Sequence, residues 1–391
     1  MYVNVAVLAE TRAHEGRVAL VPSLVARLVK LGARLHVQAG AGRSLHLMDA
    51  DFADVTISTD RDAMLRNADV VLAVQAPNLD VVETMKPGAL LICFVYADKE
   101  PALVQCLVDK RITCFAMERV PRITRAQAMD ALSSQSALAG YYAVQLGATL
   151  MRRMLPKMTT AAGAIGPARV LVMGLGVAGL EAIATAHRLG AVVQGHDVRP
   201  ETAEQARSLG ATFVETGVDA RGEGGYARAL SVEEQADVAE VLTQHLQQAD
   251  LVVTTAAIPG KPSPKLISHA QVARMKAGAV IVDLSAEGGG NCDDTQPGRT
   301  AQVGGVTIAA PLNVPSLLGS DASELYAKNV FNLLALMLKE NVIEIDWSDQ
   351  VLAQTALTHA GKRMDGPDSH PSPAPLATPT KRRHAAAVKA G

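Results

Sequence analysis

The sequence predicts an α/β fold of two domains, each built on a doubly wound parallel sheet, with a cleft between them. Three observations carry this prediction. Short apolar, β-branched runs alternate with segments of helical periodicity along most of the chain. A glycine-rich turn near the middle joins one such run to one such helical segment. The 391 residues are enough for two domains of ordinary size, each with its own core.

The first domain is expected to begin with a strand over residues 3–8. A helix over 23–31 and a strand over 34–38 follow it. The same rhythm then repeats through three further strands, at 70–73, 90–94 and 113–117.

A charged, proline-containing loop over 119–130 interrupts this rhythm and runs into a helix over 133–151. Small side chains dominate that helix, so we expect it to pack closely along the cleft between the domains. Arg122, Gln127 and Asp130 lie on the loop. From spacing alone they suit an ordinary solvated connector as well as a binding site.

Residues 168–197 carry the sharpest local signal. A buried strand leads through Gly174, Gly176 and Gly179 into a helix, and the next strand ends at Asp197. In a dinucleotide-binding fingerprint the first glycine allows a tight turn, the second lets the pyrophosphate approach, and the third lets helix and strand pack closely. Unpaired N–H groups at the helix N-terminus would hold the phosphates. The stretch therefore predicts a Rossmann-like domain that binds a dinucleotide.

Asp197 also bears on the choice of cofactor. A carboxylate there accepts hydrogen bonds from ribose hydroxyls and repels a 2′-phosphate, which favours NAD over NADP. Arg199 weakens this preference, because an arginine in that region can pair with the phosphate. The alternative for Asp197 is a solvated acid at a strand end.

The second domain continues with another helix and strand and then a glycine-rich loop over 216–228. Loops of this length are often lids, so Tyr226 is expected to fold over a bound cofactor. Strands over 250–255 and 279–283 end in glycine- or proline-rich segments, which are candidate walls of the same pocket.

A last strand, 307–309, leads to a helix over 323–339 that is expected to cross back to the first domain, making that domain discontinuous. The polar, proline-rich C-terminal segment is expected to form a flexible tail. The predicted division is 1–130 plus 316–350 for the first domain, 131–315 for the second and 351–391 for the tail.

The composition argues against several classes of protein. The net charge is −2, the basic residues are scattered and only 3% of residues are aromatic, so no nucleic-acid partner is expected. The four cysteines show no metal-ligand spacing, which predicts no metal site and a reducing compartment. No signal peptide is expected, and the longest uncharged stretch is too polar for a membrane span.

No group for proton transfer stands out in the sequence. Dehydrogenases that act on hydroxy or amino acids need an acid or base beside the carbonyl, usually His or Lys. The ten histidines form no cluster. Direct hydride transfer between two nicotinamides needs no such group, because catalysis is then a matter of positioning.

Over about residues 1–345 the sequence resembles the NAD(H)-binding alpha subunits of proton-translocating NAD(P) transhydrogenases. The motifs that carry the resemblance are EGRVA from Glu15, PRITRAQAMDALSSQS from Pro121, GLGVAGLEAIATA from Gly174, GGYA from Gly224, TTAAIPGKPSP from Thr254, AEGGGNC from Ala286 and NVPS from Asn313. The resemblance implies a Re/Si-specific enzyme. It would transfer hydride directly between NAD(H) bound here and NADP(H) on a partner component, coupled to proton translocation by membrane subunits.

The resemblance also assigns residues to the site. Asp130 and Ser133 would hydrogen-bond the nicotinamide carboxamide, and Arg122 would brace them. Gln127 would reach towards the second nucleotide, so that Arg122, Gln127 and Asp130 form the catalytic group. Tyr226 would belong to a mobile loop that closes on bound nucleotide. The other cofactor-binding residues would be Gly174, Gly176, Val177, Ala178, Gly179, Asp197, Val198, Arg199, Thr255, Ala256 and Asn291.

The resemblance implies several partners and a location. The chain would form a homodimer and dock on NADP(H)-binding and membrane-spanning transhydrogenase subunits. It would have no membrane span of its own. It would therefore be cytoplasmic, peripheral on the inner face of the plasma membrane through those subunits.

Two other functions stay open. Alanine dehydrogenases share the fold, but they place a catalytic lysine where this chain has Gln75, and a histidine one strand later, where residues 91–96 contain none. The chain could also be a non-catalytic NAD(H) sensor. A sensor needs no group aimed past the nicotinamide, so Gln127 argues against that alternative.

Overall fold

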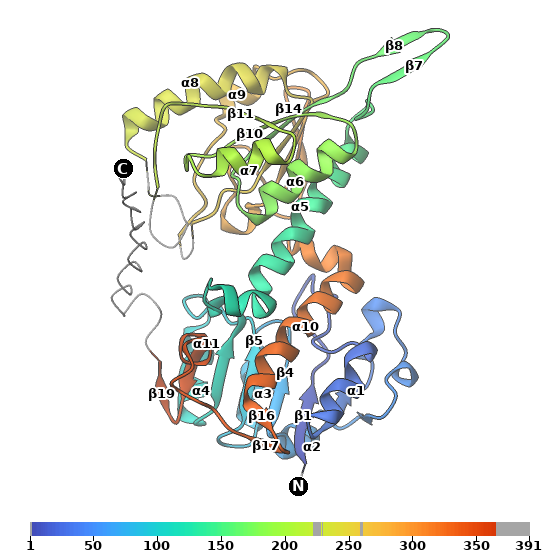
Figure 1. Cartoon of the computed structure of the whole chain (residues 1–391), viewed down its shortest axis with the longest axis vertical. Coiled ribbons are helices and arrows are strands. Elements are labelled where there is room, and N and C mark those ends of the chain that lie inside the picture. The colour runs from blue at the N-terminus through green and yellow to red at the C-terminus, as the bar shows by residue number, and fades with distance from the viewer. Residues whose placement is uncertain (1, 222–227, 229, 259–260, 365–391) are drawn as a thin grey trace, which may run out of the picture.

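The computed structural model describes residues 2–221, 228, 230–258 and 261–364. It has two α/β lobes, one above the other in Figure 1, joined by two long helices. Each lobe has a mostly parallel sheet with buried apolar side chains on both faces. The predicted fold class is thereby confirmed.

The lower lobe contains an eight-stranded sheet in the order β19-β18-β6-β5-β4-β1-β2-β3. Its parallel strands are β1 (Val3–Val7), β2 (Ala33–Gln38), β3 (Thr56–Ser58), β4 (Val70–Leu72), β5 (Leu90–Cys93) and β6 (Thr113–Ala116). The helices of this part of the chain are α1 (Pro22–Lys30), α2 (Arg61–Asn67), α3 (Leu79–Thr84) and α4 (Pro101–Asp109). The order of the strands reverses at β1, which lies between β2 and β4.

The far edge of this sheet corrects one expectation. The elements there are α11 (Gln350–Thr355), β18 (Ala356–His359) and β19 (Lys362–Arg363), and β18 pairs antiparallel with β6. A flexible tail that begins at 351 is therefore wrong, and the fold continues through β19. Val351, Leu352 and Leu357 are buried in the lower lobe. Polar residues separate them in sequence, which hid this small apolar pattern.

The upper lobe contains a seven-stranded sheet in the order β11-β10-β9-β12-β13-β15-β14. Its strands are β9 (Arg169–Met173), β10 (Val192–His196), β11 (Thr212–Phe213), β12 (Leu251–Thr254), β13 (Val280–Asp283), β14 (Thr300–Val303) and β15 (Val306–Ala309). Its helices are α6 (Val177–Arg188), α7 (Thr202–Ser208), α8 (Val232–Gln248) and α9 (His269–Val272). Only β14 runs antiparallel among these described strands. The glycine turn follows β9, where the order of the strands reverses.

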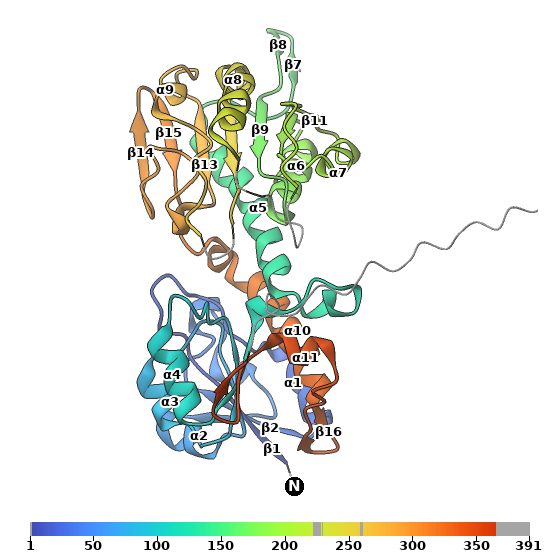
Figure 2. The same ribbon diagram turned by 90° about the vertical axis from the view of Figure 1, so that its left-hand side faces the viewer.

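Two helices connect the lobes, α5 (Ala131–Leu150) and α10 (Gly319–Met337). Figure 2 shows α5 running from the lower lobe along the upper one. A Cβ atom added to Gly140 would lie 2.0 Å from the carbonyl oxygen of Ala178, so α5 and α6 touch through their backbones. The expectation that small residues on this helix allow close packing is confirmed.

The smallest sheets are two hairpins. One joins β16 (Leu338–Lys339) to β17 (Val342–Ile343), after α10. The other joins β7 (Met158–Thr160) to β8 (Gly163–Ile165) and projects from the upper lobe, as Figures 1 and 2 show. All the residues of these two projecting strands are exposed.

Candidate functional site

A cavity of about 460 Å³ lies where the lobes meet. Arg122, Gln127, Asp130 and Ser133, which the sequence analysis selected, therefore meet at one place. Val177, the first residue of α6, joins them there. The full lining is Pro121, Arg122, Ile123, Thr124, Gln127, Asp130, Ser133 and Val177.

The loop that carries Gln127 is anchored from behind. Residues 124–129 form a 3₁₀ helix in which Ala126 and Met129 are buried in the lower core. Asn329 and Asn332 on α10 donate their side-chain amides to the carbonyl oxygen of Ala128, at 2.9 and 3.0 Å. With its backbone held in this way, the loop presents Gln127 as an exposed side chain.

Asp130 and Ser133 form the N-terminal cap of α5. The Ser133 backbone N–H donates to Asp130 Oδ1 at 2.9 Å, and the Ser133 hydroxyl donates to Asp130 Oδ2 at 2.6 Å. This arrangement makes the two side chains one rigid unit at the wall of the cavity. A carboxylate with free lone pairs beside a hydroxyl can bind a carboxamide group, which has both donors and an acceptor.

The three glycines of the turn have distinct geometries. Gly174 has a φ of +93°, in the left-handed region that favours glycine. A Cβ atom on Gly179 would lie 1.9 Å from the carbonyl oxygen of Gly174, so only glycine lets α6 pack this close to β9. A Cβ atom on Gly176 would meet open space, so the backbone there is accessible.

The N-terminus of α6 suits an anionic ligand. Gly176 is its N-cap, and no side chain of the described residues caps it. The first N–H groups of the helix, at Val177 and Ala178, therefore point to an open surface with the positive end of the helix dipole behind them. The open Gly176 backbone and the uncapped N–H groups fit a pyrophosphate, and hence a dinucleotide.

Asp197 lies beside this turn but is already engaged. Its Oδ2 accepts hydrogen bonds from Leu175 N (2.7 Å) and Arg199 Nη2 (2.7 Å), and its Oδ1 accepts from Arg199 N and Nε, both at 2.9 Å. Burial alone would raise the pKa of Asp197, but the hydrogen bonds and charge of Arg199 outweigh it and hold the pKa below its ordinary value. Arg199 thus neutralises the carboxylate that the sequence analysis assigned to the ribose.

Thr255, Ala256 and Asn291 brace the turn from the neighbouring strand end. The Thr255 hydroxyl donates to the carbonyl oxygen of Gly174 at 2.8 Å. Asn291 is fully buried, and its amide bonds both backbone groups of Ala256 and the carbonyl oxygen of Pro264. Its side chain thus holds the loop in place behind the predicted pocket.

Two of the remaining predicted residues concern the lid. Tyr226 lies outside the described residues. The carbonyl oxygen of Val198 accepts a hydrogen bond from Ala220 N at 2.8 Å, so Val198 ties the start of the glycine-rich loop to the strand that carries Asp197. Sequence reasoning missed Thr124, which lines the cavity on the same loop as Gln127.

Gln75 lies at the carboxyl edge of the lower sheet among buried carboxylates. Its side-chain amide donates to Glu15 Oε2 at 2.9 Å. The backbone N–H groups of Val74 and Gln75 donate to the carboxylate of Glu10, at 2.6 and 3.3 Å. Burial raises the pKa of Glu10 to about 7. Gln75 is thus tied into a network of side chains and cannot act as an acid or base.

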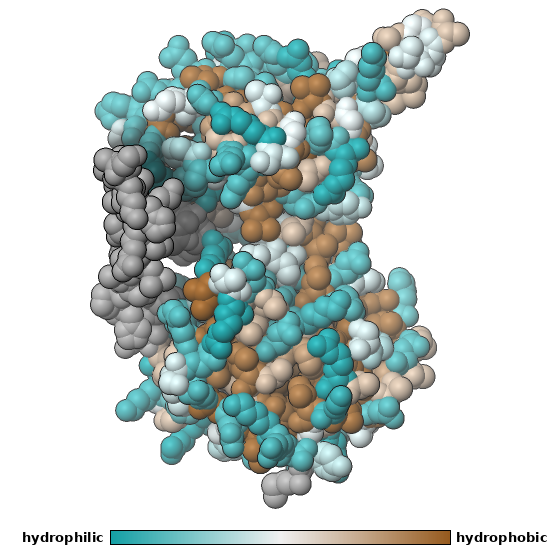
Figure 3. Space-filling model, in the orientation of Figure 1, coloured by the Kyte–Doolittle hydropathy of each residue, from teal (hydrophilic) through white to brown (hydrophobic). Residues whose placement is uncertain are grey.

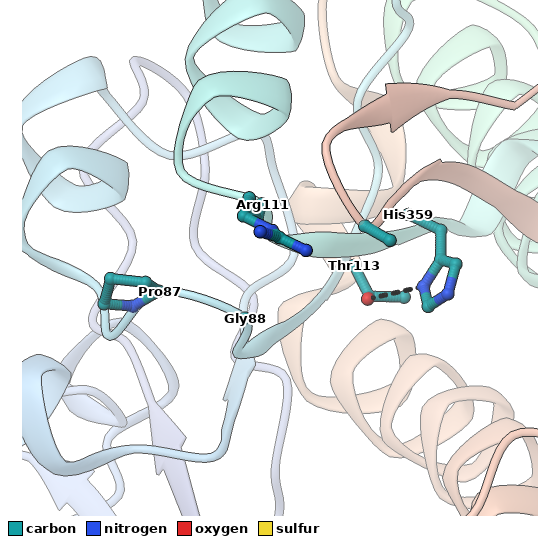
Figure 4. Close-up of a pocket in the computed structure, with 6 residues that line it drawn as sticks. Pro87, Gly88, Arg111, Thr113 and His359 are labelled. Atoms are coloured by element: carbon teal, nitrogen blue, oxygen red, sulfur yellow. Dashed lines mark hydrogen bonds between the residues drawn. The ribbon is translucent and has the colours of Figure 1, made fainter.

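A second cavity, of about 420 Å³, lies elsewhere on the lower lobe. Figure 4 shows its lining, in which Thr113 and His359 are hydrogen-bonded at 3.0 Å and Arg111 lies nearby. None of the residues selected from the sequence lines it. Across the described part of the chain, no helix is both long enough and apolar enough to cross a membrane, and no three His, Cys, Asp or Glu side chains form a group suited to a metal ion.

Fold and site together define a two-lobed, Rossmann-like protein with a dinucleotide fingerprint and a polar loop facing it across the junction. Its sequence matches the family descriptions "Alanine dehydrogenase/PNT, N-terminal domain" over residues 6–139 and "Alanine dehydrogenase/PNT, C-terminal domain" over 143–365. The chain belongs to this alanine dehydrogenase/PNT family.

Within the family, the chain is similar to transhydrogenase alpha subunits. It is 44% identical to the first of the separately encoded parts of the NAD(P) transhydrogenase subunit alpha of Rhodospirillum rubrum, over 92% of this chain and 97% of the relative. It is 40% identical to the NAD(P) transhydrogenase subunit alpha of Haemophilus influenzae, over 90% of this chain and 70% of the relative. Alanine dehydrogenase of Mycobacterium tuberculosis is 32% identical, over 75% of each chain.

Solved structures agree with this placement. The transhydrogenase of Sinorhizobium meliloti superposes with a TM-score of 0.81 at 38% identity, over 93% of this chain and 99% of that one. An L-alanine dehydrogenase superposes with a TM-score of 0.76 at 23% identity, over 94% of this chain and 98% of that one, which shows the shared fold. The resemblance inferred from the motifs is confirmed.

Proposed function

We propose that the chain is the NAD(H)-binding component of a proton-translocating transhydrogenase. Hydride would pass directly between NAD(H) bound here and NADP(H) bound on a partner component. The observation that carries this proposal is the junction cavity, where Arg122, Gln127, Asp130 and Ser133 face the start of α6. Among the described residues, its lining contains no histidine, lysine or cysteine, which suits a transfer that needs no proton.

The chemistry belongs to the nucleotides, since a hydride moves with its two electrons from one nicotinamide C4 to the other. The chain supplies position. The uncapped N–H groups of α6 hold the pyrophosphate, and the Asp130–Ser133 unit holds the carboxamide. Arg122 braces that unit, and the exposed Gln127 points past the bound nicotinamide towards the second nucleotide. The site is then one half of an active site.

The cofactor preference rests on Asp197 and Arg199. We propose that Arg199 turns away from Asp197 when NAD(H) binds, because the carboxylate has no lone pair to spare while Arg199 is bonded to it. The ribose hydroxyls then take those positions. Tyr226 and the loop around it close over the nucleotide.

The assembly is proposed in the same terms. The chain forms a homodimer and docks, on the cytoplasmic side, on NADP(H)-binding and membrane-spanning subunits that couple transfer to proton movement. The projecting hairpin of β7 and β8 supports a second copy as a partner. An isolated two-stranded hairpin is at best marginally stable in water, and this one exposes Met158 and Ile165.

The test mixes the purified chain with an NADP(H)-binding transhydrogenase component and follows hydride transfer from NADH to thionicotinamide-NADP⁺. A parallel sample holds the chain alone with NADH, pyruvate and ammonia. Transfer only with the partner component present is the expected result. NADH oxidation by the chain alone with pyruvate and ammonia would establish an alanine dehydrogenase instead, and NADH binding with neither activity would establish a sensor.

A further inference from the structure

We propose that Glu15 and Arg17 form an interdomain clamp, which fixes both connections between the lobes and so sets the position of Gln127 relative to the nucleotide turn. The clamp rests on the proposed function only for its effect on hydride transfer. Neither residue lines the junction cavity. Both follow β1, at the point where the order of the lower strands reverses.

The pair itself is buried. Arg17 Nη2 lies 2.6 Å from Glu15 Oε2 and Arg17 Nε lies 2.7 Å from Glu15 Oε1, a two-pronged contact. The Arg17 side chain is 3% exposed and that of Glu15 is 0% exposed. Burial would raise the pKa of Glu15, but the hydrogen bond and charge of Arg17 outweigh it and lower the pKa to about 2. The carboxylate is therefore charged at all ordinary pH values.

The first connection reaches the clamp through α5. Arg17 Nη1 donates to the side-chain oxygen of Gln135 at 2.8 Å, and the Gln135 amide donates to the carbonyl oxygen of Ala322 on α10 at 3.1 Å. Gln135 is 5% exposed and lies just after the Asp130–Ser133 cap. One side chain thus ties the start of α5 to Arg17 and to the other connecting helix.

The second connection reaches the clamp through the segment that precedes α10. The Asn313 amide donates to Glu15 Oε2 at 2.9 Å, and its oxygen accepts from Arg17 Nη2 at 3.2 Å. The Ser316 hydroxyl accepts from Gly16 N at 2.5 Å. The backbone N–H of Asn313 donates to Glu287 of the upper lobe at 2.7 Å. Asn313 therefore bonds to both lobes.

The donor count shows that Arg17 is structural. A guanidinium has five N–H donors, and here two bond Glu15, one bonds Gln135 and one bonds Asn313. Too few donors remain for two-pronged capture of a substrate carboxylate. The residue that could have bound an amino or keto acid is thus committed to holding the lobes together.

The clamp acts on the active half-site through α5. Gln135 lies in the first two turns of α5, which begins at the Asp130–Ser133 cap, and the loop that carries Gln127 immediately precedes this helix. The same helix touches α6 through Gly140. Clamping the start of α5 therefore fixes Gln127, Asp130 and Ser133 as one body against the fingerprint helix.

The test removes both charges together in the full chain, as Glu15→Gln/Arg17→Met, because removing one alone would strand a buried charge. Turnover of NADH with thionicotinamide-NADP⁺ and the NADP(H)-binding component should fall at least tenfold, with the dissociation constant for NADH changed by less than threefold. Spin labels at Glu83→Cys and Glu204→Cys, in a Cys106→Ser background diluted with unlabelled chain, should report a broader distance between the lobes. A merely structural loss of stability would not produce this split between turnover and binding.

Two further variants keep the test decisive. Asn313 has a φ of +42°, so Asn313→Gly keeps the backbone and removes one arm of the clamp; it should give the same effects, smaller, if the double variant does not fold. Arg61→Met/Asp80→Asn removes an exposed ion pair of the lower lobe and should change neither readout. Unchanged turnover and an unchanged distance distribution in the clamp variants would overturn the clamp. Absence of transfer in the unmodified chain would overturn the proposed function, and the distance measurement would then judge the clamp alone.

Discussion

At the scale of single residues, the site combines side chains that are already satisfied with side chains that are left exposed. Asp130 and Ser133 bond each other, and Asp197 bonds Arg199, so these groups are held in place before any ligand arrives. Gln127 and Arg122 are exposed at the cavity. Groups held in advance lose little entropy on binding, which is how a site that only positions its ligand can act.

Gln127→Ala tests the residue that we assign to the second nucleotide. NADH should bind about as well as to the unmodified chain, because Gln127 is placed beyond the nicotinamide. Hydride transfer to the NADP(H)-binding component should fall about tenfold or more, because the two nicotinamides lose alignment. Paired binding titrations and transfer rates measure this, with Thr124→Ser as the conservative control on the same loop. Normal transfer in Gln127→Ala would show that the assigned role is wrong.

Glu10→Gln tests the buried carboxyl beside Gln75. Burial raises the pKa of Glu10 from 4.5 to about 7. Stability that this group contributes is therefore fully present below pH 4.5 and is lost as the pH rises through about 7. Glutamine carries no charge at any pH, so the variant should gain on the order of 2 kcal/mol in unfolding free energy at pH 8 relative to pH 5. Urea unfolding of both chains at the two pH values checks this, and parallel pH profiles would contradict it.

At the scale of elements, most strands of the two sheets follow from sequence. The strands of both parallel sheets lie within a residue or two of their predicted positions where a buried apolar run marks them, as at 169–173. The projecting hairpin, the antiparallel edge strand β14 and the elements after residue 349 were missed. Each is short, exposed on at least one side or interrupted by polar residues, so no continuous apolar pattern marks it.

The contact between α5 and α6 gives the prediction at this scale. Alanine normally stabilises a helix relative to glycine by up to about 1 kcal/mol. At Gly140 a Cβ atom would lie 2.0 Å from the carbonyl oxygen of Ala178, so Gly140→Ala should instead destabilise the chain by about 1–3 kcal/mol. Gly166→Ala, where an added Cβ meets open space, is the control. Thermal unfolding measures both, and a stabilised Gly140→Ala variant would contradict the close packing.

At the scale of the whole molecule, two lobes and two connections define one junction. The cavity there draws on residues of the loop, α5 and α6, and the clamp draws on residues almost 300 positions apart in sequence. Figure 3 shows the lobes narrowing to this junction, with the hairpin of β7 and β8 projecting from the upper lobe in mostly white and tan rather than teal. The hairpin is the one described element that leaves the body of the molecule.

Replacing residues 158–165 by a short Gly-Ser turn tests the hairpin as a contact between two copies. The chain should sediment as a monomer at concentrations where the unmodified chain is a dimer, because the exposed apolar side chains that a second copy would cover are gone. The melting temperature of the dilute chain should change little, since the hairpin projects away from its own lobe. Sedimentation velocity decides, and a shortened chain that remains dimeric would exclude the hairpin from the interface.

The sequence alone determined what neighbouring residues decide: the alternation of strands and helices, the glycine turn, and the loop motif with Gln127. It also showed the lack of a lysine at position 75, where Gln75 stands. Helical and strand periods and turn chemistry depend on adjacent residues, so they can be read without a structure.

Only the tertiary structure decided that the loop meets the start of α6, that Arg199 occupies Asp197, and that the lower sheet takes up residues 356–363. It also decided that Arg17 is bonded to Asn313, 296 residues away. Such contacts depend on how the two sheets are joined, and a pairing between distant residues leaves no periodic trace in the chain.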